Sequence, residues 1–251
     1  RHDRGHRVWP GARAIAIAAA AGVACVVAWL QLAGVPFAAR AWAVILLVPL
    51  PIVLILQGRA LSNLETLPRT EAYISSIVSL WGLALATAGI SWVSGYGVAE
   101  LGLVTVGPWS TLLLAGAMTL GGVAVLFAFR FAGVREPQLV RELMPVSAHD
   151  RILFTGVSIT AGICEEIVFR GFLIHVLYGA TGSLAIALLL SSGVFGVAHA
   201  YQLPAGAVRA ALLGLILALP LVLHGSILPS IIAHAAIDIL SGLWLARYLL
   251  R

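Results

Sequence analysis

Long apolar runs separated by short polar stretches dominate the 251-residue sequence. A membrane-spanning helix needs about 20 consecutive, mostly apolar residues. Such runs are predicted at roughly 14–34, 41–57, 74–94, 111–131, 152–178, 183–203, 208–223 and 226–248. Because proline interrupts the helical hydrogen-bond ladder, Pro49 and Pro51 should kink the second run. The pattern therefore predicts an all-α, polytopic membrane protein with about eight transmembrane helices.

The basic residues lie mainly at the termini and in every second connecting stretch, as successive crossings of a membrane would place them. All fifteen are arginines, of which thirteen lie in stretches that share one side of the predicted membrane. Arg40 lies on the other side, and Arg170 lies within a predicted helix. Because cytoplasmic loops carry the excess of basic residues, both termini are predicted to be cytoplasmic. The N-terminal run lacks a small-residue cleavage site, so it is interpreted as a retained helix rather than a signal peptide.

The composition agrees with a membrane location. The chain is 61% hydrophobic and 10% charged, whereas soluble domains are nearer half apolar and a quarter charged. The isoelectric point of about 9.9 is explained by the topology of the arginines, and no nucleic-acid partner is expected. The absence of lysine, with the many alanines and glycines, indicates a bacterial genome, so the predicted location is multi-pass in a bacterial inner membrane. Cys25 and Cys164 lie in apolar runs and are interpreted as buried, inert thiols.

Two connecting stretches, 61–73 and 134–150, mix apolar and charged residues. Each could be a short amphipathic helix at the membrane interface or an ordinary solvated loop. The chain carries no glycine-rich phosphate loop, no Gly-x-Ser-x-Gly elbow and no His-Glu-x-x-His motif.

Ionisable residues concentrate in the second half of the apolar sequence. Charged side chains at membrane depth are rare and mark functional sites by default. Within a single membrane domain, residues 1–131 are therefore interpreted as four scaffold helices. Residues 150–248 are interpreted as the catalytic core.

The fifth run carries Glu165, Glu166 and Arg170. On a helix, Glu166 and Arg170 are four residues apart and can form an ion pair on one face. Glu165 is rotated away from Glu166 by roughly 100°. The spacing predicts a structural ion pair of Glu166 and Arg170, which leaves Glu165 free to act as a general base.

The sixth run ends in His199, and the eighth carries His234 and Asp238 on one helix face. The Asp238 carboxylate could orient the His234 imidazole, or both could contact one ion or one water. Small residues such as Gly193 and Gly196 allow helices to approach closely. Alone, each histidine could equally be a packing group. Together with Glu165, these residues can activate water or bind a divalent metal, with Zn²⁺ as the candidate cofactor.

In this order, Glu165-Glu166-x-x-x-Arg170, Phe195-x-x-x-His199 and His234-x-x-x-Asp238 resemble the three motifs of the CPBP (ABI) intramembrane protease family. That family includes the type II CAAX prenyl endopeptidases and bacterial proteins linked to bacteriocin processing or self-immunity. The resemblance covers roughly 150–248.

The resemblance implies an intramembrane (metallo)endopeptidase that forms no acyl-enzyme. Glu165 and His199 would activate the attacking water, and His234 and Asp238 would contact the oxyanion or a metal. One departure stands out, because many members carry asparagine where this chain has Asp238. Asparagine can donate a hydrogen bond to an oxyanion, whereas an ionised aspartate cannot. Asp238 therefore favours a metal-binding or histidine-orienting role, or a protonated carboxyl.

Three functions follow from these features. The first is cleavage of a membrane-associated peptide or protein. The second is a catalytically silent scaffold or accessory subunit of a membrane complex. The third is a proton-coupled transporter with Glu165, His199 and His234 as a relay, but transporters usually show repeat-like halves, and here the chemistry lies in one half.

Overall fold

The computed structural model describes residues 10–61 and 68–250, and within them it is all-helical, without a strand. The first half contains α1 (Pro10–Gln31), α2 (Phe37–Leu47), α3 (Pro49–Leu61), α4 (Arg69–Val93), α5 (Pro108–Phe131) and α6 (Gln138–Glu142). The second half contains α7 (Ala148–Glu165), η1 (Glu166–Leu173), α8 (Ile174–Thr181), α9 (Leu184–Ala198), η2 (Ala200–Gln202), α10 (Leu203–Leu217), α11 (Leu219–His224), α12 (Leu228–Ile239), η3 (Leu240–Leu245) and α13 (Ala246–Leu249). The predicted fold class is confirmed.

Among the described residues, six helices are long and apolar enough to cross a membrane. They are Phe37–Leu61, Arg69–Val93, Pro108–Phe131, Ala148–Thr181, Ala200–His224 and Leu228–Leu249. The other two predicted spans coincide with shorter apolar helices, Ile17–Gln31 and Leu184–Ala198. The chain is a multi-pass membrane protein, while the count of eight crossings and the orientation of the termini stay predictions.

The predicted kink in the second span is present. The helix is interrupted at Val48, which separates α2 from α3, and Pro49 opens α3. Proline lacks the N–H that would continue the ladder of α2. The sequence signal and the observed break therefore have the same cause.

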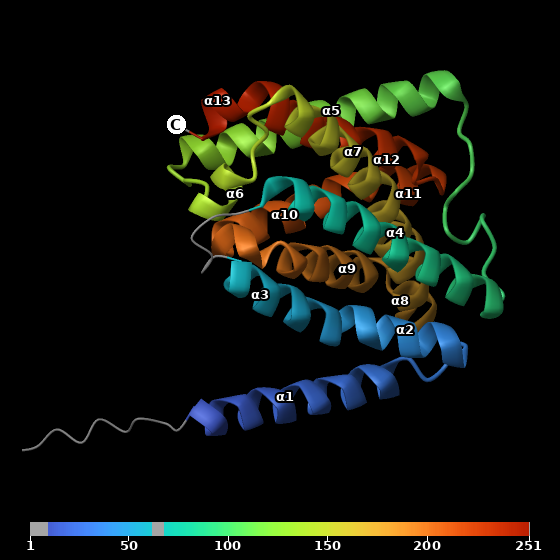
Figure 1. The fold of residues 1–251 in the computed structure, drawn as a ribbon. Helices are drawn as coiled ribbons and strands as arrows, with labels where there is room; N and C mark the ends of the chain where they lie inside the picture. The colour runs from blue at the N-terminus through green and yellow to red at the C-terminus, as the bar shows by residue number, and fades with distance from the viewer. Residues whose placement is uncertain (1–9, 62–67, 251) are drawn as a thin grey trace, which may run out of the picture.

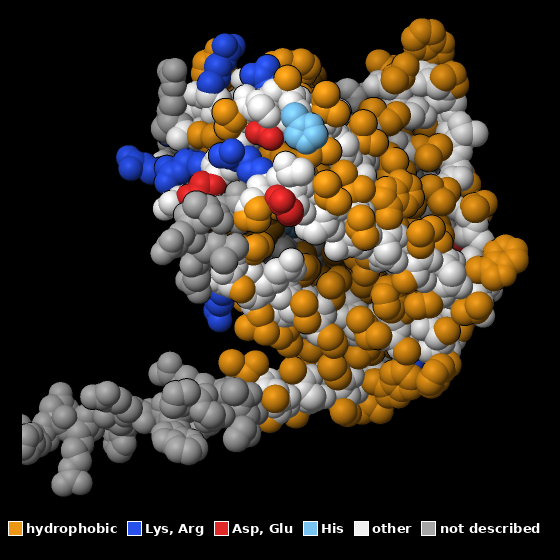
Figure 2. Space-filling view, in the orientation of Figure 1, with side chains coloured by type: hydrophobic (Ala, Val, Ile, Leu, Met, Phe, Trp, Pro, Cys, Tyr) orange, Lys and Arg blue, Asp and Glu red, His pale blue; other side chains and the backbone are white. Residues whose placement is uncertain are grey.

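The helices form a bundle in which α1 lies along one side (Figure 1). In this view α1 begins and α13 ends at the same end of the bundle, where α6 also lies. Figure 2 shows that Arg, Asp and Glu side chains gather towards that end, whereas hydrophobic side chains cover most of the remaining visible face. This segregation is the one expected from the arginine alternation.

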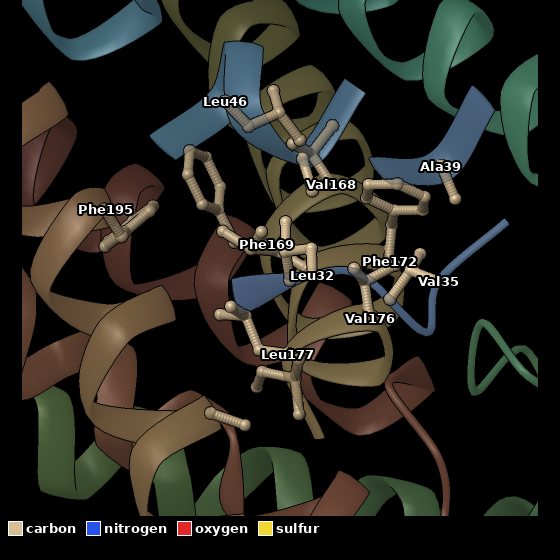
Figure 3. Close-up of a cluster of buried hydrophobic side chains, with 14 of the residues drawn as sticks. Leu32, Val35, Ala39, Leu46, Val168, Phe169, Phe172, Val176, Leu177 and Phe195 are labelled. Atoms are coloured by element: carbon tan, nitrogen blue, oxygen red, sulfur yellow. The ribbon is translucent and has the colours of Figure 1, made fainter. Parts of the chain in front are cut away.

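The predicted scaffold packs directly on the motif-bearing helix. The main buried cluster joins Leu32, Val35, Ala39 and Leu46 of the N-terminal helices and their connection with Val168 and Phe172 of η1 (Figure 3). Each of these side chains is less than a tenth exposed. The first two helical segments thus cover the apolar face of the turn that carries Glu166 and Arg170.

Two helix pairs approach at glycines. A Cβ on Gly162 of α7 would lie 2.8 Å from the Ile231 carbonyl oxygen of α12, and one on Gly196 of α9 would lie 2.8 Å from Cβ of Ala211 in α10. Gly196 is therefore a close-approach residue, as predicted. Gly193 is not, because a Cβ there would meet open space.

For the two connecting stretches, 61–73 and 134–150, the sequence left open a short helix or a loop. Stretch 134–150 contains the short helix α6. The Arg69 guanidinium donates to the Glu142 carbonyl and the Tyr73 hydroxyl to the Leu143 carbonyl, so α4 holds the end of α6. The central part of stretch 61–73, residues 62–67, lies outside the described residues.

Candidate active site

The motif helix changes its geometry where its chemistry begins. It starts as α7 with a capping box, in which Ser147 accepts from the Asp150 N–H and the Asp150 carboxylate accepts from the Ser147 N–H. At Glu166 it widens into the π-helical segment η1. Single π-helical turns inside α-helices occur often at functional sites. The α-helical spacing of the sequence did not predict this widening.

Gly171 lies in the middle of the π-helical segment. A Cβ at this position would lie 2.7 Å from the carbonyl oxygen of Leu101 in the long connection between α4 and α5. The connection is held in turn by the N–H of Ile227, which donates to the Gly102 carbonyl over 2.8 Å. Glycine thus lets the widened helix pack against backbone.

Glu166 joins the two motif helices. Its Oε1 lies 3.0 Å from Nη1 of Arg170, which confirms the predicted ion pair, and 2.7 Å from Nδ1 of His234 on α12. The Glu166 side chain is fully buried and that of Arg170 is 1% exposed. Since a carboxylate only accepts hydrogen bonds, Nδ1–H of His234 donates and Nε2 points the other way. Glu166 is therefore both an ion-pair partner and the residue that orients His234.

Nε2 of His234 faces the two remaining carboxylates. Glu165 Oε2 and Asp238 Oδ2 each lie 3.7 Å from it, beyond hydrogen-bonding distance. Exposure rises through the three carboxylates, from 0% for Glu166 to 15% for Glu165 and 39% for Asp238. The site therefore opens past Asp238, and Glu166 forms its closed end.

Phe195 of α9 links the second histidine to this group. Its ring centroid lies 4.6 Å from that of His199 and 5.9 Å from that of His234. The Arg170 guanidinium carbon lies 4.2 Å from the same ring centroid, a cation–π contact. Nδ1–H of His199 donates to the Phe195 carbonyl over 2.8 Å, which leaves Nε2 of a neutral ring as a proton acceptor.

The predicted site residues thus come together from three helices. The residue that contacts His234 differs from the predicted one. The sequence suggested Asp238 as the residue that could orient His234, because the two are four apart on one helix. Glu166 makes the close contact instead, and Asp238 stays at the open side. A partner on another helix cannot be read from the spacing within one helix.

The sequence also predicted a set of metal ligands, which comprises Glu165, His199, His234 and Asp238. A Zn²⁺ site in proteins has three or four N, O or S ligands around one point. In residues 10–61 and 68–250, no group of three or more His, Cys, Asp or Glu side chains is arranged to hold a metal ion. The donors do not fit a preformed metal site, so no step below is routed through a metal.

The comparison with known families covers the segment that carries all three motifs. Residues 147–240 match the family described as type II CAAX prenyl endopeptidase Rce1-like. This part of the chain is therefore similar to that protease family. No curated protein and no solved structure gives a significant match.

The matched segment begins at the N-cap of α7 and ends just beyond Asp238. It therefore contains the complete cluster around His234, and it leaves out α1 to α6. The resemblance to the CAAX protease family that the three motifs predicted is confirmed. The match supports a protease in general; the roles of single residues, the metal and the substrate are taken up as proposals.

Proposed function

We propose that the chain is an intramembrane endopeptidase that hydrolyses a peptide bond of a membrane-associated peptide or protein. The observation that carries the proposal is the state of Glu165. Its Oε2 is buried and has no hydrogen-bond partner among the described residues. A buried polar atom without a partner is costly unless a ligand or water satisfies it, and a carboxylate next to a substrate carbonyl can take a proton from that water.

Glu165 and the neighbouring His199 supply the proton transfers that this chemistry needs. Glu165 accepts a proton from water, and the hydroxide oxygen adds to the carbonyl carbon of the peptide bond. Nε2 of His199 accepts a hydrogen bond from the same water. When the C–N bond breaks, the proton on Glu165 passes to the leaving amine, and both carboxylate and imidazole return to their starting states. Because the nucleophile is water, no acyl-enzyme forms.

Glu166, Arg170 and His234 serve the same reaction differently. The Glu166–Arg170 pair is buried at the closed end of the site, where it fixes Nδ1 of His234. His234 then holds a fixed orientation between Glu165 and the substrate. A bacterial inner membrane as the location, and a small membrane peptide as the substrate, are part of this proposal.

Glu165→Gln tests the proposed function. The substitution keeps the size of the side chain and removes the base, which typically contributes about 10²–10⁴-fold. The purified variant in detergent or nanodiscs should keep the wild-type unfolding temperature and peptide affinity, while cleavage of a membrane peptide is nearly lost. Glu71→Gln, on the partly exposed first turn of α4, is the matched control. If Glu165→Gln cleaved at the wild-type rate, a scaffold function would be favoured.

A further inference from the structure

The proposed hydrolysis needs hydrogen-bond donors that the predicted residues do not supply. A peptide carbonyl gains negative charge as the hydroxide adds, and preorganised donors stabilise it. Glu165 and Asp238 are acceptors when ionised. The Nδ1–H groups of His199 and His234 are already bound to Phe195 and Glu166.

A hydroxyl group lies beside the site on the turn that follows His199. Tyr201 belongs to η2, and its ring centroid is 6.0 Å from that of His199. Tyr201 therefore lies beside His199, which the proposed reaction places on the attacking water.

Hydrogen bonds fix which way the Tyr201 hydroxyl can donate. Nη2 of Arg209 donates to Oε1 of Gln202 over 2.9 Å, so the other end of that amide is its NH₂ group. This Nε2 donates to the Tyr201 hydroxyl oxygen over 3.1 Å. The phenol oxygen is therefore used as an acceptor, and the structure records no hydrogen bond donated by it to any described residue. Its O–H remains available for another acceptor.

Arg209 is itself fixed by an acidic partner. It forms a two-pronged ion pair with Glu136, and both side chains are 10% exposed. Forked arginine–carboxylate pairs are among the strongest and most directional polar contacts. The chain Glu136–Arg209–Gln202–Tyr201 thus runs from the connection before α6 to the edge of the site.

The backbone around Tyr201 is held as firmly as its hydroxyl. A Cβ on Gly58 of α3 would lie 2.8 Å from Cβ of Tyr201, so α3 packs tightly on this residue. Leu203, two residues on, has φ +67° and ψ 170°, a region that only glycine visits readily. Such strain persists where the surroundings enforce it, and it clusters at functional sites.

We propose that Tyr201 is a further catalytic residue, which donates its phenolic O–H to the oxyanion formed on the substrate carbonyl. The inference rests on the proposed function. The proton stays on the phenol, and the hydrogen bond strengthens as negative charge develops on the carbonyl oxygen. Nε2 of His234, which lies 3.7 Å from Glu165 and from Asp238, is the competing donor when that nitrogen carries a proton.

Tyr201→Phe in the purified full-length chain tests the proposal. The ring and its packing on Gly58 are kept, and only the donor is lost. Removal of one oxyanion donor costs about 10²–10³-fold in kcat, so kcat should fall by that order while KM and the unfolding temperature stay close to wild type. Tyr178→Phe, at an exposed position of α8, is the matched control and should cleave like wild type.

Asp238→Asn supplies a second, independent test. Because asparagine brings an N–H donor, this change should raise kcat alone and restore much of the activity when combined with Tyr201→Phe. An unchanged kcat in Tyr201→Phe, or a fall in kcat in Asp238→Asn, overturns the role of Tyr201. Neither outcome touches the proposed function, which fails instead if wild type does not cleave or if Glu165→Gln cleaves fully.

Discussion

Glu166 Oε1 lies between Nη1 of Arg170 and Nδ1 of His234, at 3.0 Å and 2.7 Å. One buried oxygen therefore fixes a residue of its own helix and a residue of α12. Neutralising a buried charge and orienting an imidazole are two requirements, and they can be separated by substitution.

Arg170→Ala should strongly destabilise the protein. Removing one partner of a buried ion pair costs about 3–5 kcal/mol, because the other charge is left uncompensated. Thermal unfolding in detergent and the yield of folded protein measure this loss. Arg151→Ala, at an exposed position of α7, is the control.

The double variant Glu166→Met, Arg170→Met separates the two requirements. With both charges gone, folded yield should exceed that of Arg170→Ala. Cleavage should remain low, because His234 has lost the carboxylate that orients it. Wild-type stability of Arg170→Ala would contradict the bracing role, and full cleavage by the double variant would contradict the orienting role.

Gly162→Ala should damage the site through helix packing. The added methyl would lie 2.8 Å from the Ile231 carbonyl oxygen and 2.9 Å from the Ala235 nitrogen, so α7 and α12 must move apart. Glu165 and Glu166 would then separate from His234, and cleavage and unfolding temperature should both fall. Overpacking of this kind typically costs about 1–3 kcal/mol.

Gly193→Ala is the matched control for Gly162→Ala. A Cβ at Gly193 meets nothing within 4 Å, and alanine is the better helix former by about 1 kcal/mol. Its unfolding temperature should equal or exceed that of wild type. If both alanine variants behaved alike, close approach at Gly162 would not hold the two motif helices together.

Chelation tests the metal that the family resemblance suggested. The described donors are not arranged around one point, so cleavage should persist after extensive dialysis against a strong chelator, and elemental analysis should find less than one metal per chain. Loss of cleavage on chelation, with recovery on addition of Zn²⁺, would establish a metal role for Glu165, His234 and Asp238.

The orientation in the membrane can be tested with reporter fusions. The arginine distribution places the connection that contains α6 on the cytoplasmic side and the connection between α4 and α5 on the opposite side. A fusion after Trp109 should therefore report outside, and one after Val140 inside. The reversed pair of signals would place the charged end of the bundle (Figure 2) outside.

The sequence alone determined the features that depend on neighbours along the chain. Apolar run length gave the helical class and the positions of the segments, because each membrane helix satisfies its own backbone hydrogen bonds. The prolines gave the break between α2 and α3. The four-residue spacing of Glu166 and Arg170 gave their ion pair, since residues that far apart share a helix face.

Only the tertiary structure decided which helices meet and through which atoms. The contact of Glu166 with His234 crosses 68 positions of the chain and depends on the backbone approach at Gly162. The π-helical segment η1 packs at Gly171 against the connection between α4 and α5, a contact between distant parts of the chain. Nothing in the sequence pattern marked Tyr201, because its hydroxyl gains a direction only through Gln202, Arg209 and Glu136. Contacts between distant segments arise from packing, and a one-dimensional pattern contains no information on their geometry.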